Sequence, residues 1–181
     1  MKLDLGCGRN CYKAVDKDGK EEKFTGVDIS PNEGVDVVHD LTIFPFPFED
    51  ESIDEIYSSH FLEHLDGPIR GKFMDECYRI MKTGTKMRVI HPYYRSIRSI
   101  QDFSHRWPPI GESSYLYFNK TWREANKLTY GAYDLKCNFE FTIFYTFADM
   151  SWSNKSEETR NFAMKHYNDI ISDLIVDLVK V

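Results

Sequence analysis

The chain has 181 residues with 41% hydrophobic and 29% charged side chains, a composition typical of a folded domain rather than a disordered segment. No apolar run is long enough to span a bilayer, no signal peptide is readable, and the net charge of −6 argues against a nucleic-acid coat or a membrane-surface protein. We therefore expect a cytoplasmic protein of one domain, residues 1–181, with free thiols at its 4 cysteines.

The first half of the chain alternates short strands with loops and one helix. β-Branched runs predict strands at residues 2–5, 24–28, 35–40, 53–58 and 86–90. A helix is predicted to begin at Pro68, because proline suits the first helical position, and to end at Gly84, which fits a C-cap. The first connection, residues 10–23, is short and has a charged turn at 16–20, so it can hold little helix. Such alternation indicates a parallel sheet with right-handed crossovers.

The second half follows a different pattern. Residues 91–117 are rich in aromatic, Arg, Ser and Pro residues without a clear period, which predicts a long ordered loop or short helices with a functional role. A capping box opening at Thr121 predicts a helix to residue 128, and Ser156 predicts another to about 168. Strands are predicted over residues 139–147 and 174–181, although the last segment could also continue the preceding helix.

Charge is distributed unevenly along the chain. Residues 79–106 contain seven basic residues and one acid, whereas residues 49–66 contain seven acids and no Lys or Arg. These segments could be two solvated faces, or the basic one could form a rim where an anionic group docks. The second interpretation rests on Arg95, Arg98 and Arg106, which follow the fifth predicted strand.

One motif indicates a nucleoside site. The first strand leads into a loop with Gly6 and Gly8, whose missing Cβ atoms permit close backbone approach to a ligand. The second strand ends in Asp28, a carboxylate that can accept hydrogen bonds from both hydroxyls of a ribose. Cys11 occupies the third glycine position of the dinucleotide fingerprint, and Asp4 would repel a pyrophosphate. The loop therefore suits a cationic or zwitterionic ligand, such as a sulfonium with an amino-acid tail.

These motifs resemble those of class I S-adenosylmethionine-dependent methyltransferases. Leu3-Asp-Leu-Gly-Cys-Gly8 is similar to the family's first motif, Gly26-Val-Asp28 to the second and His39-Asp-Leu41 to the third. The stretch ending in Leu62-Glu-His64 is similar to a subfamily signature after the fourth strand, and Arg79-Ile-Met-Lys-Thr-Gly84 is similar to the turn before the fifth, with Thr83 in place of a proline. The resemblance covers residues 2–92. It implies an α/β fold with a Rossmann-like, mostly parallel seven-stranded sheet that lacks N-terminal helices.

The resemblance also implies a cofactor, S-adenosylmethionine, and the residues that bind it. Asp28 would bind the ribose, Asp40 would lie near the adenine amine, and the Leu41 backbone would lie near the ring. The implied site consists of Asp4, Gly6, Cys7, Gly8, Asp28, Ile29, Asp40, Leu41, Ser59 and His60. Residues 1–92 would thus be the cofactor-binding half. Residues 93–181 would supply the acceptor loop, helices and terminal antiparallel strands.

Four side chains are candidates for the catalytic site because they follow the fourth or fifth strand or lie in the irregular segment. They are His60, His91, Tyr93 and His105. Each could instead bond to local backbone, pack in the core or lie on a surface loop. Methyl transfer from a sulfonium is an in-line displacement, so positioning suffices and no fixed triad is required. We predict no metal site, since Cys7 and Cys11 lack a second ligand pair.

The acceptor is inferred by analogy with the Leu-Glu-His subfamily. We expect a small or anionic acceptor such as a sugar, a nucleotide or a glycan precursor, with residues 91–117 as its lid. Two alternatives stay open: a nucleic-acid methyltransferase that uses the basic segment, and a non-catalytic S-adenosylmethionine-binding module. Against base methylation, Ser58-Ser-His-Phe61 stands where DNA amino-methyltransferases carry a Pro-Pro motif. The sequence leaves the oligomeric state open.

Overall fold

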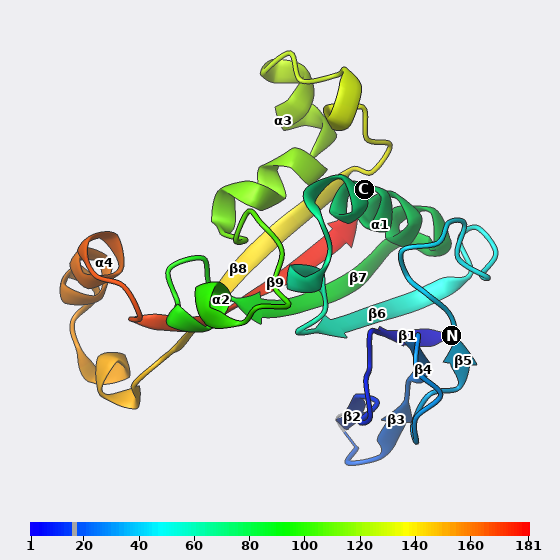
Figure 1. Cartoon of the computed structure of the whole chain (residues 1–181), viewed down its shortest axis with the longest axis horizontal. Helices are drawn as coiled ribbons and strands as arrows, with labels where there is room; N and C mark the ends of the chain where they lie inside the picture. The colour runs from blue at the N-terminus through cyan, green and yellow to red at the C-terminus, as the bar shows by residue number, and fades with distance from the viewer. Residues whose placement is uncertain (16–17) are drawn as a thin grey trace.

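A seven-stranded sheet forms the centre of the computed structural model, which describes residues 1–15 and 18–181 (Figure 1). The strand order is β5-β4-β1-β6-β7-β9-β8. The bounds are β1 Lys2–Leu5, β4 Thr25–Asp28, β5 Val37–Val38, β6 Ile53–Ser59, β7 Met81–Pro92, β8 Phe139–Phe147 and β9 Ile171–Lys180. The first five of these are parallel, whereas β9 is antiparallel to β7 and β8. This confirms the predicted fold class, including the strand over the last residues.

The first connection forms a hairpin rather than a crossover helix. Strands β2 (Lys13–Val15) and β3 (Glu21–Lys23) pair antiparallel, and β4 follows β3 almost directly. Lys2 of β1 joins this hairpin to the sheet through ion pairs with Glu22 and Glu55. Of the charged turn predicted at 16–20, Asp16 and Lys17 lie outside the described residues.

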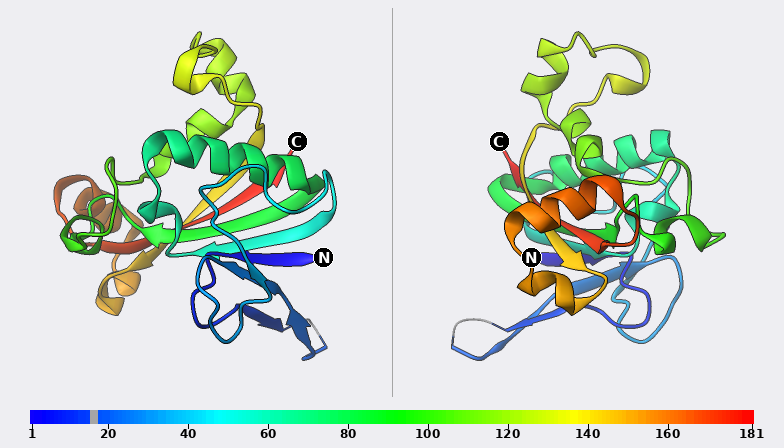
Figure 2. Two further views of the ribbon diagram at one scale, coloured as in Figure 1. Left: turned by 45° about the vertical axis from the view of Figure 1, so that its right-hand side comes forward. Right: turned by 90° about the vertical axis from the view of Figure 1, so that its left-hand side faces the viewer.

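Helix α1 (Gly67–Ile80) covers one face of the sheet (Figure 2). Pro68 lies in its first turn as predicted, and the buried side of the helix presents Phe73, Met74 and Cys77 to the core. The predicted end at Gly84 is wrong, because the chain enters β7 directly after Ile80.

Gly84 has a different role. Met81 pairs with Ile53 and Lys86 pairs with Glu55, so the β7 residues between them bulge out of register. Gly84 lies in this bulge at a φ of 79°, a backbone conformation that glycine adopts without strain.

Four helices in all are found in the described residues, and those of the second half are short. Their bounds are α2 Ile97–Gln101, α3 Lys120–Ala125 and α4 Glu157–His166, with 3₁₀ turns at Leu62–His64, Glu112–Phe118, Gly131–Tyr133 and Met150–Asn154. The predicted cap at Thr121 is wrong, since Asn119 Oδ1 accepts the N–H of Trp122 instead. Ser156 caps α4 as predicted by accepting the N–H of Thr159. No helix in the described part of the chain is long and apolar enough to cross a membrane.

The parallel strands bring their carboxyl ends to one edge of the sheet. Alternate residues of the strands, among them Leu3, Val27, Ile56, Val89 and Val176, are fully buried and form one continuous core with α1. Residues just beyond the strand ends therefore meet at one edge, and the predicted ligand-binding residues are found there.

Candidate active site

The glycine loop after β1 has a backbone that only glycine adopts readily. Gly6 has a φ of 75° and Gly8 a φ of 60°. A Cβ on Gly6 would lie 2.4 Å from the ring of Phe61, whereas a Cβ on Gly8 would meet nothing within 4 Å. The N–H of Gly6 donates to the carbonyl of Val27 at 2.8 Å, which fixes the loop to β4. Gly6 therefore serves close packing, and Gly8 leaves an open approach for a ligand.

Asp28, at the end of β4, connects the loop to the second motif. Its Oδ2 accepts the N–H of Gly8 at 2.9 Å, and its Oδ1 accepts the N–H of Ser30 at 3.0 Å. Each carboxylate oxygen has two lone pairs, so both can still accept a ribose hydroxyl. Asp28, the residue predicted to bind the ribose, is thus held rigidly beside the loop.

Asp4 is a buried carboxylate beneath the same loop. It is 3% exposed and accepts the N–H of Tyr12 at 2.7 Å. Burial raises the pKa of Asp4 to about 6, although the Tyr12 N–H opposes the shift. A cationic ligand beside this carboxylate would lower its pKa and relieve the desolvation of its charged form.

A cavity of about 390 Å³ opens directly onto these groups. It is lined by Asp4, Gly6, Cys7, Asn10, Tyr12, Tyr57, Ser59 and His60. Five of these residues belong to the predicted cofactor set, and Asn10, Tyr12 and Tyr57 were missed. The rings of Tyr12 and Tyr57 stack with centroids 3.8 Å apart. That contact spans residues far apart in sequence, and no sequence motif signals it.

The predicted adenine-binding residues lie further along the edge of the sheet. Ile29 is 61% exposed, whereas Leu41 is buried. Asp40 Oδ1 accepts the hydroxyl of Thr42 at 2.7 Å and its N–H at 2.9 Å, and these bonds lower the pKa of Asp40. Asp40 is therefore an anchored acceptor, and Ile29 presents an apolar surface to solvent.

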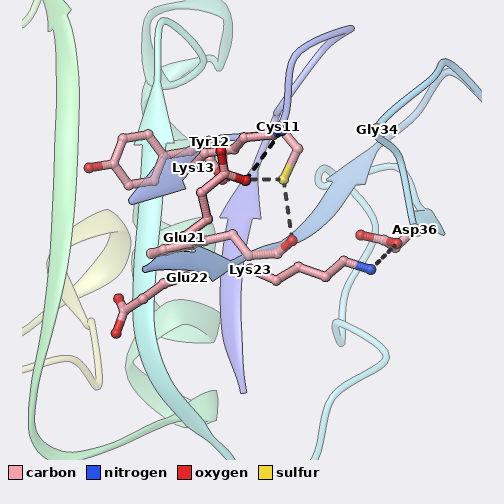
Figure 3. A pocket seen from close by; sticks show the side chains of 9 residues that line it. Cys11, Tyr12, Lys13, Glu21, Glu22, Lys23, Gly34 and Asp36 are labelled. Carbon is pink, nitrogen blue, oxygen red and sulfur yellow. Dashed lines mark hydrogen bonds and ion pairs between the residues drawn. The ribbon is translucent and has the colours of Figure 1, made fainter. Parts of the chain in front are cut away.

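A separate pocket lies against the hairpin. Figure 3 shows its lining of Cys11, Tyr12, Lys13, Glu21, Glu22, Lys23, Phe24, Gly34 and Asp36. Lys23 Nζ lies 3.2 Å from the Asp36 carboxylate across its mouth (Figure 3). None of the predicted cofactor residues is among the described residues that line this pocket, whereas five of them line the cavity at the glycine loop.

His60 lines the cavity at the glycine loop and also a neighbouring pocket. It follows β6 with a φ of 54°, and its Nδ1 lies 3.2 Å from Glu63 Oε1. The hydrogen bond with Glu63 raises the pKa of His60 above its ordinary value. The neighbouring pocket, about 440 Å³, is lined by His60, Glu63, His64, Pro92, Arg98, Gln101, Asp102 and His105. Of the four catalytic candidates, the structure brings His60 and His105 together here.

The other two candidates lie inside the protein. His91 is fully buried between the Pro92 carbonyl, 2.9 Å from Nδ1, and the Tyr115 hydroxyl, 2.9 Å from Nε2. Burial lowers the pKa of His91 to about 4, so the ring is neutral at pH 7. Tyr93 is 4% exposed, and its hydroxyl donates to Glu112 Oε1 at 2.9 Å. Both side chains support the segment after β7 from within.

Residues 91–117 are anchored to α1. The guanidinium of Arg70, itself buried, donates to the carbonyls of Arg106 at 2.9 Å and Pro108 at 2.6 Å. Ser96, Ser99 and Ile110 are buried as well. The segment therefore forms a fixed wall of the pocket that contains His60, Glu63 and His105, which we call the second pocket.

The basic residues of 79–106 are mostly paired with acids. The ion pairs are Arg79–Asp50, Lys82–Asp54, Lys86–Asp177, Arg88–Asp177 and Arg98–Asp173. Arg95 donates to the carbonyls of Met164 and Lys165 at the end of α4. Of the three arginines of the predicted basic rim, Arg98 is therefore paired with an acid and Arg95 with backbone carbonyls, while the two partners from the acidic segment, Asp50 and Asp54, pair with Arg79 and Lys82 outside the rim.

Comparisons with known proteins agree with this fold. Residues 3–89 match the family model described as methyltransferase domain. An S-adenosylmethionine-dependent methyltransferase from Archaeoglobus fulgidus is 21% identical with a TM-score of 0.64, over 99% of this chain and 85% of that one. The protein bound to the Trm112 methyltransferase activator of Haloferax volcanii is 16% identical with a TM-score of 0.57, over 99% and 81%. No curated protein matches significantly.

A third similar structure contains the demethylated cofactor. It is the geranyl diphosphate C-methyltransferase from Streptomyces coelicolor A3(2), in complex with Mg²⁺, geranyl diphosphate and S-adenosyl-L-homocysteine. It is 14% identical with a TM-score of 0.53, over 99% of this chain and 72% of that one. The match over residues 3–89, the strand order and the glycine loop agree with the fold of S-adenosylmethionine-dependent methyltransferases.

Proposed function

We propose that the chain methylates a small polar acceptor held in the pocket beside His60. The observation that carries the proposal is that His60 lines both cavities, the one at the glycine loop and the one under residues 91–117. In-line transfer needs the acceptor atom directly opposite the sulfonium, and a pocket that shares the His60 side chain with the cavity at the glycine loop is a candidate place for that atom. The bound cofactor supplies the electrophilic methyl carbon.

The residues of the chain fit the cofactor. Asp4 offers a buried negative charge to a zwitterionic ligand, Asp28 offers two acceptor oxygens to a ribose, and Gly8 leaves open space above the loop. In this proposal Asp4, Gly6, Cys7, Ser59 and His60 surround the methionine part, and Asp28, Ile29, Asp40 and Leu41 hold the nucleoside. His60 positions the acceptor, and His105 contacts it from the opposite wall.

The second pocket favours a small molecule over a nucleic acid. Its volume of about 440 Å³ falls within the range of small-molecule sites. A nucleic-acid surface requires unpaired Lys and Arg along a backbone track, but Arg98, the one Lys or Arg among the described residues that line the pocket, is engaged by Asp173. A sugar, a nucleotide or a glycan precursor remains within this class, with polar contacts rather than an arginine cluster as the means of recognition.

Calorimetry with S-adenosylmethionine and S-adenosyl-L-homocysteine tests the first half of the proposal. We expect micromolar binding of both, and the absence of binding of either would refute the assignment of the cavity. A screen of hydroxylated and amine acceptors for release of S-adenosyl-L-homocysteine tests the second half.

At saturating cofactor, His60→Ala should reduce turnover at least about 10-fold, because the side chain acts on the acceptor. It should also weaken cofactor binding, because His60 lines the cavity at the glycine loop. His166→Ala, an exposed histidine at the end of α4, serves as the matched control. Tight cofactor binding without turnover on any acceptor, and no effect of His60→Ala, would favour a non-catalytic binding module instead.

A further inference from the structure

Three potential metal ligands gather at the back of the second pocket. A carboxylate oxygen of Glu63, a ring nitrogen of His64 and a ring nitrogen of His105 lie within 4.8 Å of one another. Glu63 and His64 belong to the 3₁₀ turn after β6, whereas His105 comes from the irregular segment after α2. The described residues contain no other such group of three or more.

Glu63 gives an independent sign that a ligand is expected. It is 5% exposed, and its Oε1 interacts with His60. Its Oε2 is the one buried side-chain oxygen or nitrogen in the described residues that has no hydrogen-bond partner. Buried carboxylate oxygens are almost always satisfied, because an unpaired one carries a large desolvation cost. A cation beside Oε2 would remove that cost.

The ring of His105 has its Nε2 3.7 Å from Asp102 Oδ2, which is too far for a hydrogen bond. Its Nδ1 lies 3.3 Å from the carbonyl of Ser99, which can only accept a hydrogen bond. Nδ1 therefore carries the proton of the neutral ring, and Nε2 carries the lone pair. A backbone carbonyl that fixes the tautomer in this way is typical of histidines that bind metals.

In His64 the proton position is fixed in the same way, by a hydrogen-bond chain through Ser104 and Asp102. The hydroxyl of Ser104 donates its proton to Asp102 Oδ1 at 2.6 Å, so its oxygen must accept from His64 Nδ1, 3.2 Å away. Nδ1 of His64 thus carries the proton, and Nε2 carries the lone pair. The carboxylate–hydroxyl–imidazole chain also orients the exposed ring.

We propose that Glu63 Oε2, His64 Nε2 and His105 Nε2 bind one divalent first-row transition metal ion, such as Zn²⁺. One carboxylate and two imidazoles form a mixed oxygen and nitrogen set, which favours these ions over Mg²⁺ and Ca²⁺. Ligand atoms at about 2.1 Å from a tetrahedral ion lie about 3.4 Å apart, so atoms that are up to 4.8 Å apart in this structure must move closer together to bind one ion. His64 is exposed and permits this movement.

Three protein ligands leave positions for solvent or for an acceptor oxygen. The same pocket contains His60, so a metal-bound oxygen would lie near the cofactor cavity. This consequence rests on the proposed function, whereas metal binding itself does not. The site differs from the Cys7–Cys11 pair, whose thiol pKa values burial raises to about 12 and about 11.

The experiment measures metal alone, without cofactor or acceptor. Tag-free protein is treated with EDTA, desalted and titrated calorimetrically with ZnCl₂, with MgCl₂ as the contrasting ion. We expect one Zn²⁺ per chain with an affinity at least about 10-fold above that for Mg²⁺, and an increase in Tm on addition of Zn²⁺.

The variants locate the ion. His64→Ala changes an exposed side chain and should fold, and it should lower Zn²⁺ affinity at least about 10-fold, as should Glu63→Gln. His166→Ala and the double variant Cys7→Ser/Cys11→Ser should bind as the unmodified protein does. The proposal is overturned if the unmodified protein binds no Zn²⁺, or if His64→Ala binds it equally well while the cysteine variant does not. Cofactor binding with no metal binding would leave the proposed function intact and reject this site alone.

Discussion

The edge of the sheet at the glycine loop and the edge at the second pocket are built in different ways, and we call them the cofactor edge and the acceptor edge after the roles proposed for them. At the cofactor edge, Gly6, Gly8 and Asp28 lie within a few residues of strand ends and act mainly through backbone geometry. At the acceptor edge, side chains come from β6, β7 and the segment after α2, and their partners decide whether they face a ligand. His91 lies in the last residues of β7 and His60 directly follows β6, yet the first is sealed in the core and the second faces two cavities.

The largest effect is expected for Gly6→Ala. The added Cβ would combine a left-handed backbone with a 2.4 Å contact to the Phe61 ring, so we expect the free energy of unfolding to fall by about 2–4 kcal/mol. Cofactor affinity should be lost, as measured by calorimetry on the folded fraction. Gly131→Ala is the matched control, because Gly131 has a φ of 57° and open space around it. Equal effects of the two substitutions would mean that backbone strain alone, rather than the tight loop, governs this edge.

Asp4→Asn should separate stability from function at the cofactor edge. The amide oxygen can still accept the Tyr12 N–H, while the buried charge is removed. The pKa of Asp4 is about 6 in the folded protein and 3.8 ordinarily, so the charged carboxylate disfavours folding. Above pH 6 it lowers the free energy of unfolding by up to about 3 kcal/mol, and this loss shrinks as the pH falls toward 4. Urea denaturation at pH 8 should therefore show Asp4→Asn as the more stable protein, with weakened cofactor binding. Lower stability at pH 8 would contradict the burial argument.

His91→Gln should reveal the opposite pH dependence at the acceptor edge. The folded pKa of about 4 lies below the ordinary value of 6.5, so the unfolded chain binds the proton first and stability falls as the pH drops from 6.5 toward 4. The effect reaches about 3 kcal/mol and opposes that of Asp4 in the same pH window. His91→Gln should lose stability at pH 8 through weaker packing, but its unfolding free energy should decline less between pH 6.5 and 4.5. An unchanged slope would show that His91 does not titrate as its burial implies.

The sequence predicted more of the cofactor edge than of the acceptor edge for a physical reason. Glycines, strand-terminal aspartates and alternating apolar residues are local signals, and they placed the sheet and the loop correctly. The errors at Gly84 and Thr121 also concern local signals, but there a β-bulge and the Asn119 cap took precedence. The burial of His91 depends on Tyr115, and the cluster around Glu63 depends on His105. Such contacts across the chain have no periodicity that a single sequence could show.

Arg98→Ala should have the smallest effect. It tests the ion pair between Arg98 and Asp173 in the predicted basic rim. The Arg98 guanidinium is half-exposed and is bound by both oxygens of Asp173, at 2.9 and 3.1 Å. A partly exposed pair of this kind contributes about 0–1 kcal/mol, so urea denaturation should show a correspondingly small loss.

If an anionic acceptor or a nucleic acid used this edge, Arg98→Ala would weaken binding and reduce its salt dependence. Asp173 already pairs with the charge of Arg98, so we expect only weak binding of nucleic acid. Fluorescence anisotropy with labelled RNA and DNA at low salt should show no binding tighter than about 10 μM, for the unmodified protein or for Arg98→Ala. That limit is no tighter than ordinary non-specific binding. Micromolar or tighter binding that disappears in Arg98→Ala would show that the ion pair opens for a polyanion, and the acceptor edge would then have to be reinterpreted as a nucleic-acid surface.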